Sequence, residues 1–121
     1  MRGLWLVALG SALGGSARYG VYRLAGALGL VEFPWGTLVV NALGSFVIGW
    51  FAAASPVESI GARQFVMTGI CGGFTTFSAF SLDTLGMLRN GESLKAVLNT
   101  ASQVALCLAA VWAGHAAGMR R

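Results

Sequence analysis

Long apolar stretches fill most of this chain, and short segments separate them. Four stretches are each long enough to cross a bilayer, because a membrane helix needs about 20 mostly apolar residues. They span residues 3–28, 35–54, 63–88 and 94–118. The pattern predicts an all-α membrane protein, in which residues 1–121 form one domain of four transmembrane helices.

Composition excludes several other classes. Hydrophobic residues make up 56% of the chain and charged residues 10%, whereas a soluble domain carries about 25% charged residues. The net charge is +4, but the basic residues are scattered and form no stripe, so the expected partner is the lipid bilayer and not a nucleic acid. The sequence holds no phosphate-binding glycine loop and no paired catalytic carboxylates, so no enzymatic activity is expected.

Polar residues in the second and third stretches indicate transport. Asn41 sits in the middle of the second, and the run GGFTTFSAFS at residues 72–81 sits in the middle of the third. Polar groups at this depth are costly and usually face a bundle interior or an ion pathway. Asn41 therefore needs a buried partner. Elsewhere, small residues at every fourth position of the last stretch predict close helix packing: Ala101, Ala105, Ala109, Ala113 and Ala117.

The third stretch is expected to break near mid-membrane. Gly72 and Gly73 weaken a helix by up to about 1 kcal/mol each relative to alanine, and β-branched Thr75 and Thr76 follow. A break frees backbone carbonyls, which survive at this depth only where protein, water or an ion satisfies them. Carbonyls that converge from two antiparallel copies would form a cation site. A simple kink, or a close-packing contact, is the alternative interpretation.

Aromatic side chains recur through the same run. Phe74, Phe77 and Phe80 are three residues apart, and hydroxyl residues lie beside them. An aromatic ring has a positive edge, so rings turned edge-on to a pore would favour an anion. Plain packing of the rings is the alternative interpretation.

Basic residues are almost evenly divided between the two sides of the membrane. The side of the termini has Arg2, Arg63, Arg120 and Arg121, and the other side has Arg23, Arg89 and Lys95. Orientation follows an imbalance of Lys and Arg in short loops, and here there is almost none. Insertion both ways up is expected, and with it an antiparallel homodimer with a two-fold axis in the membrane plane. A parallel oligomer is the alternative.

Together these stretches resemble the Fluc/CrcB family of bacterial fluoride channels, which are small four-helix proteins that export toxic fluoride. The matching motifs are GGSARY at residues 14–19, PWGTLVVN at 34–41, GSF at 44–46 and GICGGFTTFSAFS at 69–81. The resemblance covers all four stretches, although the last one carries little of the signature.

The resemblance implies a passive, fluoride-selective channel in the bacterial inner membrane. It implies an antiparallel, dual-topology homodimer whose third helix is broken at mid-membrane. It also implies a central structural Na⁺ bound by main-chain carbonyls, which by position belong to Gly72 and Thr75 of each subunit.

The resemblance also assigns the fluoride pathway. Its residues are the paired phenylalanines, an asparagine, two hydroxyl residues and a vestibule arginine: Phe77, Phe80, Asn41, Thr76, Ser81 and Arg18. The fourth stretch offers Asn99, Ser102 and Gln103, and no motif selects among them.

A small proton-coupled multidrug antiporter is the alternative function, since such proteins also have four helices. Proton exchange needs a carboxylate deep in the membrane. Glu32, Glu58 and Glu92 lie in loops or at the ends of stretches, and Asp83 lies toward the end of the third. A packing subunit that transports nothing would leave Asn41 unexplained.

Overall fold

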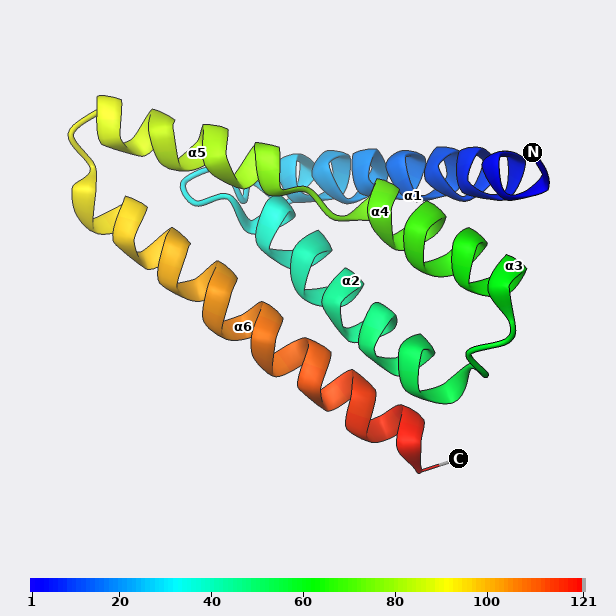
Figure 1. Cartoon of the computed structure of the whole chain (residues 1–121). Helices are drawn as coiled ribbons and strands as arrows, with labels where there is room; N and C mark the ends of the chain where they lie inside the picture. The colour runs from blue at the N-terminus through cyan, green and yellow to red at the C-terminus, as the bar shows by residue number, and fades with distance from the viewer. Residues whose placement is uncertain (121) are drawn as a thin grey trace.

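The computed structural model describes residues 1–120 as a bundle of helices, so Arg121, one of the charges counted for orientation, lies outside the described residues. Figure 1 shows the order of the helices along the chain. Their bounds are α1 Arg2–Ala27, α2 Trp35–Ala54, α3 Ile60–Arg63, the π-helix η1 Gln64–Cys71, α4 Gly72–Phe74, α5 Phe77–Arg89 and α6 Ser93–Met119.

Within residues 1–120, three helical segments are long and apolar enough to cross a membrane: Trp35–Ala54, Ile60–Arg89 and Ser93–Met119. The prediction of four such helices is therefore confirmed for three. The α1 helix has 26 residues, but glycine, alanine, serine and arginine dilute its large apolar side chains. The α1 helix is therefore long enough to cross a bilayer, but it is less apolar than the other three segments.

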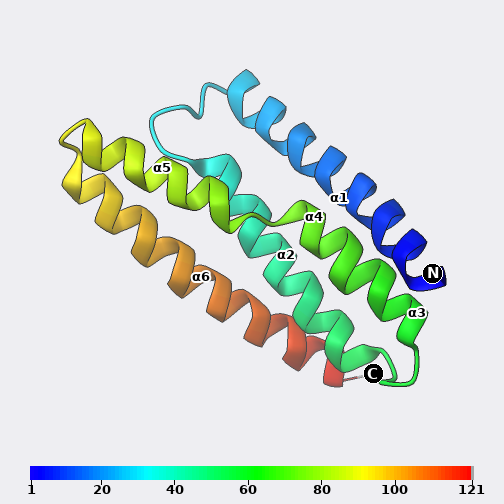
Figure 2. The same ribbon diagram turned by 45° about the horizontal axis from the view of Figure 1, so that its top comes forward.

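The third span breaks at Thr75 and Thr76, which are both extended (φ −85°, ψ 158° and φ −154°, ψ 117°). The break is confirmed, but its predicted position at the glycine pair is wrong. Gly72 is helical, with φ −63° and ψ −38°. Threonine favours extended backbone because its branched side chain loses freedom in a helix. The two halves of the span are visible as α4 and α5 in Figure 2.

Gly73, the second glycine of the pair, instead contributes close packing. A Cβ added at Gly73 would lie 2.5 Å from the Ser11 carbonyl oxygen and 3.0 Å from the Gly15 nitrogen. On the facing helix, a Cβ at Gly14 would collide with the Ile70 carbonyl oxygen. Small residues let helix backbones approach in this way. Gly73 thus lets α4 lie directly against α1.

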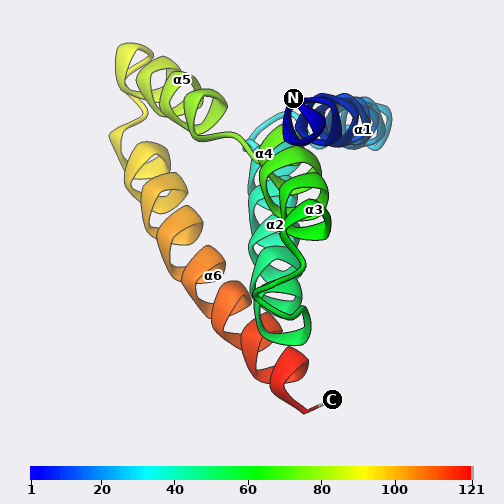
Figure 3. The ribbon, with the colours of Figure 1, turned by 45° about the vertical axis from the view of Figure 1, so that its right-hand side comes forward.

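The helices pack in two main pairs. The α1 helix lies against η1 and α4, while α2 lies along α6, and α5 reaches over to α6 beyond the break. Figure 3 shows α5 and the N-terminal end of α6 leaning away from the other helices, whereas the C-terminal end of α6 lies beside α2. On α6 the buried positions are Ala96, Asn99, Gln103, Gly114 and Gly118.

The alanine stripe of α6 faces outward from the part of the chain that the structure describes. Ala101, Ala105, Ala109, Ala113 and Ala117 are all exposed. Within the described chain no helix covers these positions, so close packing there stays a prediction for a contact with a second copy. Glycine supplies the contact instead, since a Cβ added at Gly114 would collide with the Phe46 carbonyl oxygen of α2.

Candidate functional site

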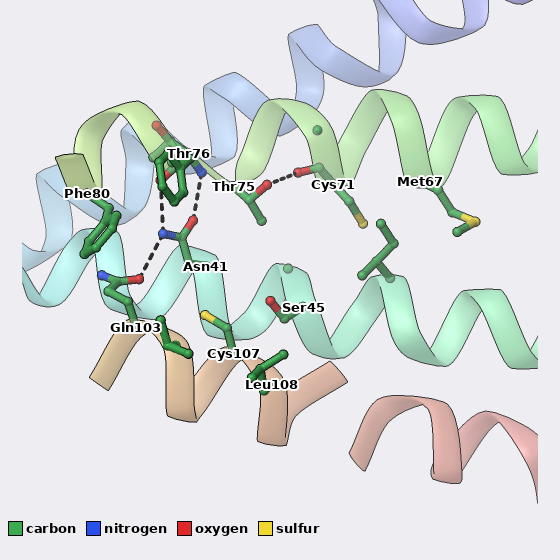
Figure 4. Close-up of a pocket in the computed structure, with 15 residues that line it drawn as sticks. Asn41, Ser45, Met67, Cys71, Thr75, Thr76, Phe80, Gln103, Cys107 and Leu108 are labelled. Atoms are coloured by element: carbon green, nitrogen blue, oxygen red, sulfur yellow. Dashed lines mark hydrogen bonds between the residues drawn. The ribbon is translucent and has the colours of Figure 1, made fainter. Parts of the chain in front are cut away.

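A cavity of about 510 Å³ lies where the broken span faces α2 and α6. Figure 4 shows side chains from all three directions pointing into it. Its polar lining groups lie at the break and on the facing helices, and its remaining walls are apolar. In the part of the chain that the structure describes, no carboxylate lines this cavity.

The Asn41 side chain forms hydrogen bonds with both backbone polar groups of Thr76. The Thr76 backbone N–H donates to Asn41 Oδ1 at 2.7 Å, and Asn41 Nδ2 donates to the Thr76 carbonyl oxygen at 3.1 Å. The side-chain amide therefore binds Thr76 much as a neighbouring strand would. A broken helix at this depth must satisfy these groups within the protein. Thr76 thus supplies the buried partner that Asn41 was expected to need.

Gln103 extends this network from α6. The second Asn41 Nδ2–H donates to Gln103 Oε1 at 3.0 Å. Gln103 is only 5% exposed, and its Nε2 has no hydrogen-bond partner among residues 1–120. In Figure 4 this nitrogen points away from Asn41, toward Phe80. A buried donor without a partner costs about 1–3 kcal/mol, so the position favours a ligand that accepts a hydrogen bond.

Thr76 also starts the helix beyond the break. Its Oγ1 accepts from the Ala79 backbone N–H at 3.0 Å, and the Ser78 hydroxyl lies 3.2 Å away. This is an N-cap, and it fixes where α5 begins. The N-terminus of α5, which has 13 residues, therefore lies at the cavity. The positive end of a helix dipole favours an anion there.

Phe77 and Phe80 both line the cavity from the first turn of α5. Their ring centroids are 5.3 Å apart and their planes are tilted by 65°, an edge-to-face arrangement. Phe77 is 78% exposed on the single chain, whereas Phe80 is half-buried. Within the described chain the two rings are therefore not enclosed in a core.

The two carbonyls predicted to bind a cation have lost their usual helical donors. In an unbroken helix the Gly72 carbonyl would accept from the Thr76 N–H, which instead bonds Asn41. The Thr75 carbonyl would accept from the Ala79 N–H, which instead bonds Thr76 Oγ1. Both residues line the cavity. These freed oxygens fit a hard cation such as Na⁺.

The Thr75 hydroxyl is occupied within its own helix. It donates to the Cys71 carbonyl oxygen at 2.8 Å, and the Thr75 backbone N–H bonds the same oxygen at 3.0 Å. The side chain therefore needs no ion to satisfy it. Among residues 1–120, no three His, Cys, Asp or Glu side chains gather as a metal site.

The predicted pathway residues are only partly brought together. Asn41, Thr76, Phe77 and Phe80 line one cavity, but within the described chain Ser81 and Arg18 do not. Ser81 is exposed and donates to the Phe77 carbonyl oxygen at 3.0 Å. Arg18 is half-buried on α1.

Sequence reasoning did not select Gln103 on α6. Asn99 and Gln103 are the buried polar candidates, and Ser102 is half-buried. Asn99 Nδ2 donates to the Thr84 hydroxyl at 3.1 Å, and only Gln103 reaches Asn41. The spacing of four residues between Asn99 and Gln103 was the signal that placed both on one face.

A second polar cluster was also missed. Thr37 is 4% exposed and donates to Asp83 Oδ2 at 3.0 Å. The Tyr22 hydroxyl lies 3.2 Å from Thr37 Oγ1. Because the single Thr37 proton goes to Asp83, Tyr22 is the donor in that contact. Thr37 lies one turn before Asn41, and the sequence did not show that Asp83 faces it.

Comparison with known proteins gives a consistent result. Residues 5–115 match the family described as "CrcB-like protein, Camphor Resistance (CrcB)". A protein of Methylocella silvestris named "Fluoride-specific ion channel FluC" is 50% identical over 117 residues, which cover 93% of this chain and 88% of the relative. "Fluoride-specific ion channel FluC 1" of Rhodopseudomonas palustris is 52% identical over 122 residues, or 95% and 85%.

Proposed function

This chain belongs to the CrcB-like family, and we propose that it is a passive, fluoride-specific ion channel. It is a multi-pass membrane protein and not an enzyme. The observation that carries the proposal is the cavity at the break, where Gln103, with its unpartnered Nε2 donor, and the N-terminus of α5 both form part of the lining. Fluoride is small and strongly hydrated, so a site must supply donors to replace its water.

The proposed pathway passes the phenylalanine pair. The edges of Phe77 and Phe80 carry partial positive charge, which attracts an anion without holding it as tightly as a full charge would. Asn41 and Thr76, bonded to each other, form a polar part of the same lining, and Ser81 and Arg18 belong to the approach outside the cavity. Weak successive contacts suit conduction, because an ion must leave as easily as it enters.

The channel is proposed to be an antiparallel homodimer of dual topology. The near balance of basic residues supports insertion both ways up. The exposed alanine stripe of α6 and the 78% exposure of Phe77 leave surfaces that a second copy would cover. Tags on the carboxyl terminus should be labelled from both faces of the membrane. Labelling from one face alone would contradict the arrangement.

A structural Na⁺ is proposed on the axis of this dimer. The carbonyls of Gly72 and Thr75 in two copies would supply four oxygens, which repel one another unless a cation lies between them. The positive charge would also lower the cost of an anion nearby, since charges interact strongly in a low-dielectric interior. Support comes from the loss of both carbonyls' helical donors to the Asn41 and Thr76 side chains.

A proton-coupled antiporter is a weaker alternative. Asp83 is the one carboxylate that the sequence places within the three candidate spans. It accepts from Thr37 and lies outside the lining of the cavity among the described residues. Coupled exchange would need an acid in the substrate path.

The decisive experiment is anion efflux from liposomes that contain the purified protein. Fluoride should leave rapidly with no proton gradient, whereas chloride should be retained. Empty liposomes correct for the leak of the lipid itself. Chloride efflux at a comparable rate, or fluoride efflux that requires a proton gradient, would contradict the proposed function.

A further inference from the structure

We propose that the cavity beside the α1–α2 loop binds the ammonium group of a lipid headgroup, with Asp83 as its counter-charge. This cavity has a volume of about 360 Å³ and shares no lining residue with the cavity at the break. The end of α1, the loop before α2, the start of α2 and the N-terminal half of α5 form its walls. The site goes beyond the proposed function, since its lining includes none of the residues proposed for the fluoride pathway.

The Asp83 carboxylate lacks a positive partner in the part of the chain that the structure describes. Both ion pairs among residues 1–120 belong to Lys95, and no basic side chain of these residues lines the cavity. Asp83 lies inside the third span, which ends at Arg89. Ionisable side chains within a span are costly and are almost always paired. A cationic group from outside the described residues is therefore the expected partner of Asp83.

A relay of hydrogen bonds holds this carboxylate in place. The Tyr22 hydroxyl on α1 lies 3.2 Å from Thr37 Oγ1 on α2, and Thr37 donates to Asp83 Oδ2 at 3.0 Å. The Thr37 bond uses one of the roughly four acceptor positions of an ionised carboxylate. Asp83 Oδ1 accepts no hydrogen bond from residues 1–120. The carboxylate is thus tied to α1 and α2 and keeps acceptor positions for a ligand in the cavity.

Three aromatic side chains line the same cavity and favour an organic cation. They are Tyr22, Phe33 and Trp35, and the ring centroids of Phe33 and Trp35 are 5.0 Å apart with a tilt of 54° between the planes. The face of an aromatic ring attracts an ammonium group, and tryptophan does so most strongly. A hard metal ion would instead need several oxygen ligands, whereas Asp83 is the one carboxylate of the lining within residues 1–120. The ligand class is therefore an ammonium group attached to carbon.

The position of the cavity selects a lipid as the source of this group. Trp35 begins α2 and is exposed, as in the aromatic belt at a membrane surface. At a helical rise of about 1.5 Å per residue, Asp83 lies about 9 Å from the end of its span, near the boundary of the hydrocarbon core. Leu30 and Val31 follow the turn at Gly29 (φ 71°), line the same cavity and are exposed. Their apolar surface offers a contact for the chain of the lipid.

The test is native mass spectrometry of the full-length protein with two lipids that carry the same acyl chains. Dioleoyl phosphatidylethanolamine has a primary ammonium group, and dioleoyl phosphatidylglycerol has none. We expect the wild type to bind the ethanolamine lipid about tenfold more tightly, since hydrogen bonds between charged groups are the strong ones. Asp83→Asn keeps an oxygen for the Thr37 donor and removes the charge, so this preference should be lost. Glu58→Gln changes an exposed loop carboxylate outside the cavity and should keep the preference.

A third lipid makes the test independent of how the variants fold. N-acetylated phosphatidylethanolamine keeps the phosphate and the chains but has no ammonium charge, so it should bind to the wild type as weakly as the glycerol lipid. Equal binding of all three lipids would overturn the proposal, including the case in which a basic side chain of a second copy fills the site. A preference that survives in Asp83→Asn would also overturn it, because the ammonium group would then bind elsewhere.

Free ethanolamine distinguishes a lipid from a soluble amine. If ethanolamine binds to the wild type but the three lipids bind equally, the assignment to a lipid is wrong. The lipid measurement reads binding alone. A wild-type protein that does not conduct fluoride would therefore refute the proposed function and leave this site unaffected.

Discussion

The two halves of residues 72–81 are built in opposite ways. The first half, around Gly73, packs backbone against the backbone of α1. The second half is extended at Thr75 and Thr76, begins α5 at Phe77, and lines the cavity. Asn41, from another helix, satisfies the backbone there. Glycine therefore allows close approach of two helices in this motif, whereas a side chain from another helix makes the break possible.

The largest effect is expected at the break. Asn41→Leu leaves the Thr76 N–H and carbonyl buried without partners, at about 1–3 kcal/mol for each group. It also frees Gln103 from its fixed orientation. Fluoride efflux should be lost, and the detergent-solubilised protein should melt at a lower temperature. If efflux and melting temperature both match those of the wild type, the broken segment does not depend on Asn41.

The glycine half is tested by a neighbouring pair. Gly73→Ala places a Cβ against the Ser11 carbonyl oxygen, 2.5 Å away before relaxation, so α1 must move from α4. Overpacking of this kind costs about 1–3 kcal/mol. The loss of stability is measured by heating the protein and following its unfolding with size-exclusion chromatography.

Gly72→Ala is the matched control. A Cβ at Gly72 meets no atom of the described chain within 4 Å, and its backbone is helical. Alanine is favoured over glycine in a helix by up to about 1 kcal/mol. Equal losses of stability at both positions would show that close approach to α1 is not the role of Gly73.

Phe80→Ile separates ring chemistry from bulk at the cavity. Isoleucine is apolar but has no positive ring edge. We expect an assembled protein whose fluoride efflux is about tenfold lower, equivalent to about 1.4 kcal/mol. Measurement in liposomes should accompany a check that the variant elutes as the wild type does. Unchanged efflux would return Phe80 to a packing role.

The smallest effect is expected at Thr75→Val. The hydroxyl bonds only Cys71 in its own helix, so its loss should cost about 1 kcal/mol. The Thr75 carbonyl, the proposed sodium ligand, is unchanged. Fluoride efflux should stay near that of the wild type, and Na⁺ should remain bound in metal analysis of the purified protein. Loss of Na⁺ would assign the ion to the side chain and not to the backbone.

Much of the fold could be predicted from the lengths of the hydrophobic stretches. The predicted helix over residues 35–54 matches α2, because Pro34 precedes it and Trp35–Ala54 is uninterrupted. The position of the break could not be predicted from the sequence. Glycine propensity is a local property, but the break depends on Asn41, 35 residues away in the chain. The selection of Gln103 required the same tertiary contact, and spacing alone placed it only on a face.

The alanine stripe shows a different limit. Small residues indicate that something approaches closely, but they do not identify it. The buried glycines of α6 contact α2 within the chain, while the alanines lie on the outer surface. A periodic pattern therefore could not separate contacts within one chain from contacts with lipid or a second copy.

The pairing of Asn41 with Thr76 has a consequence for biogenesis. A ribosome completes α2 before the third span, so the asparagine is already present when the broken segment enters the bilayer. The exposed peptide groups of Thr76 would otherwise meet hydrocarbon during insertion. The order of helices in the gene thus protects a vulnerable intermediate. A circular permutant that translates α2 last should insert its broken span poorly and be degraded by membrane proteases.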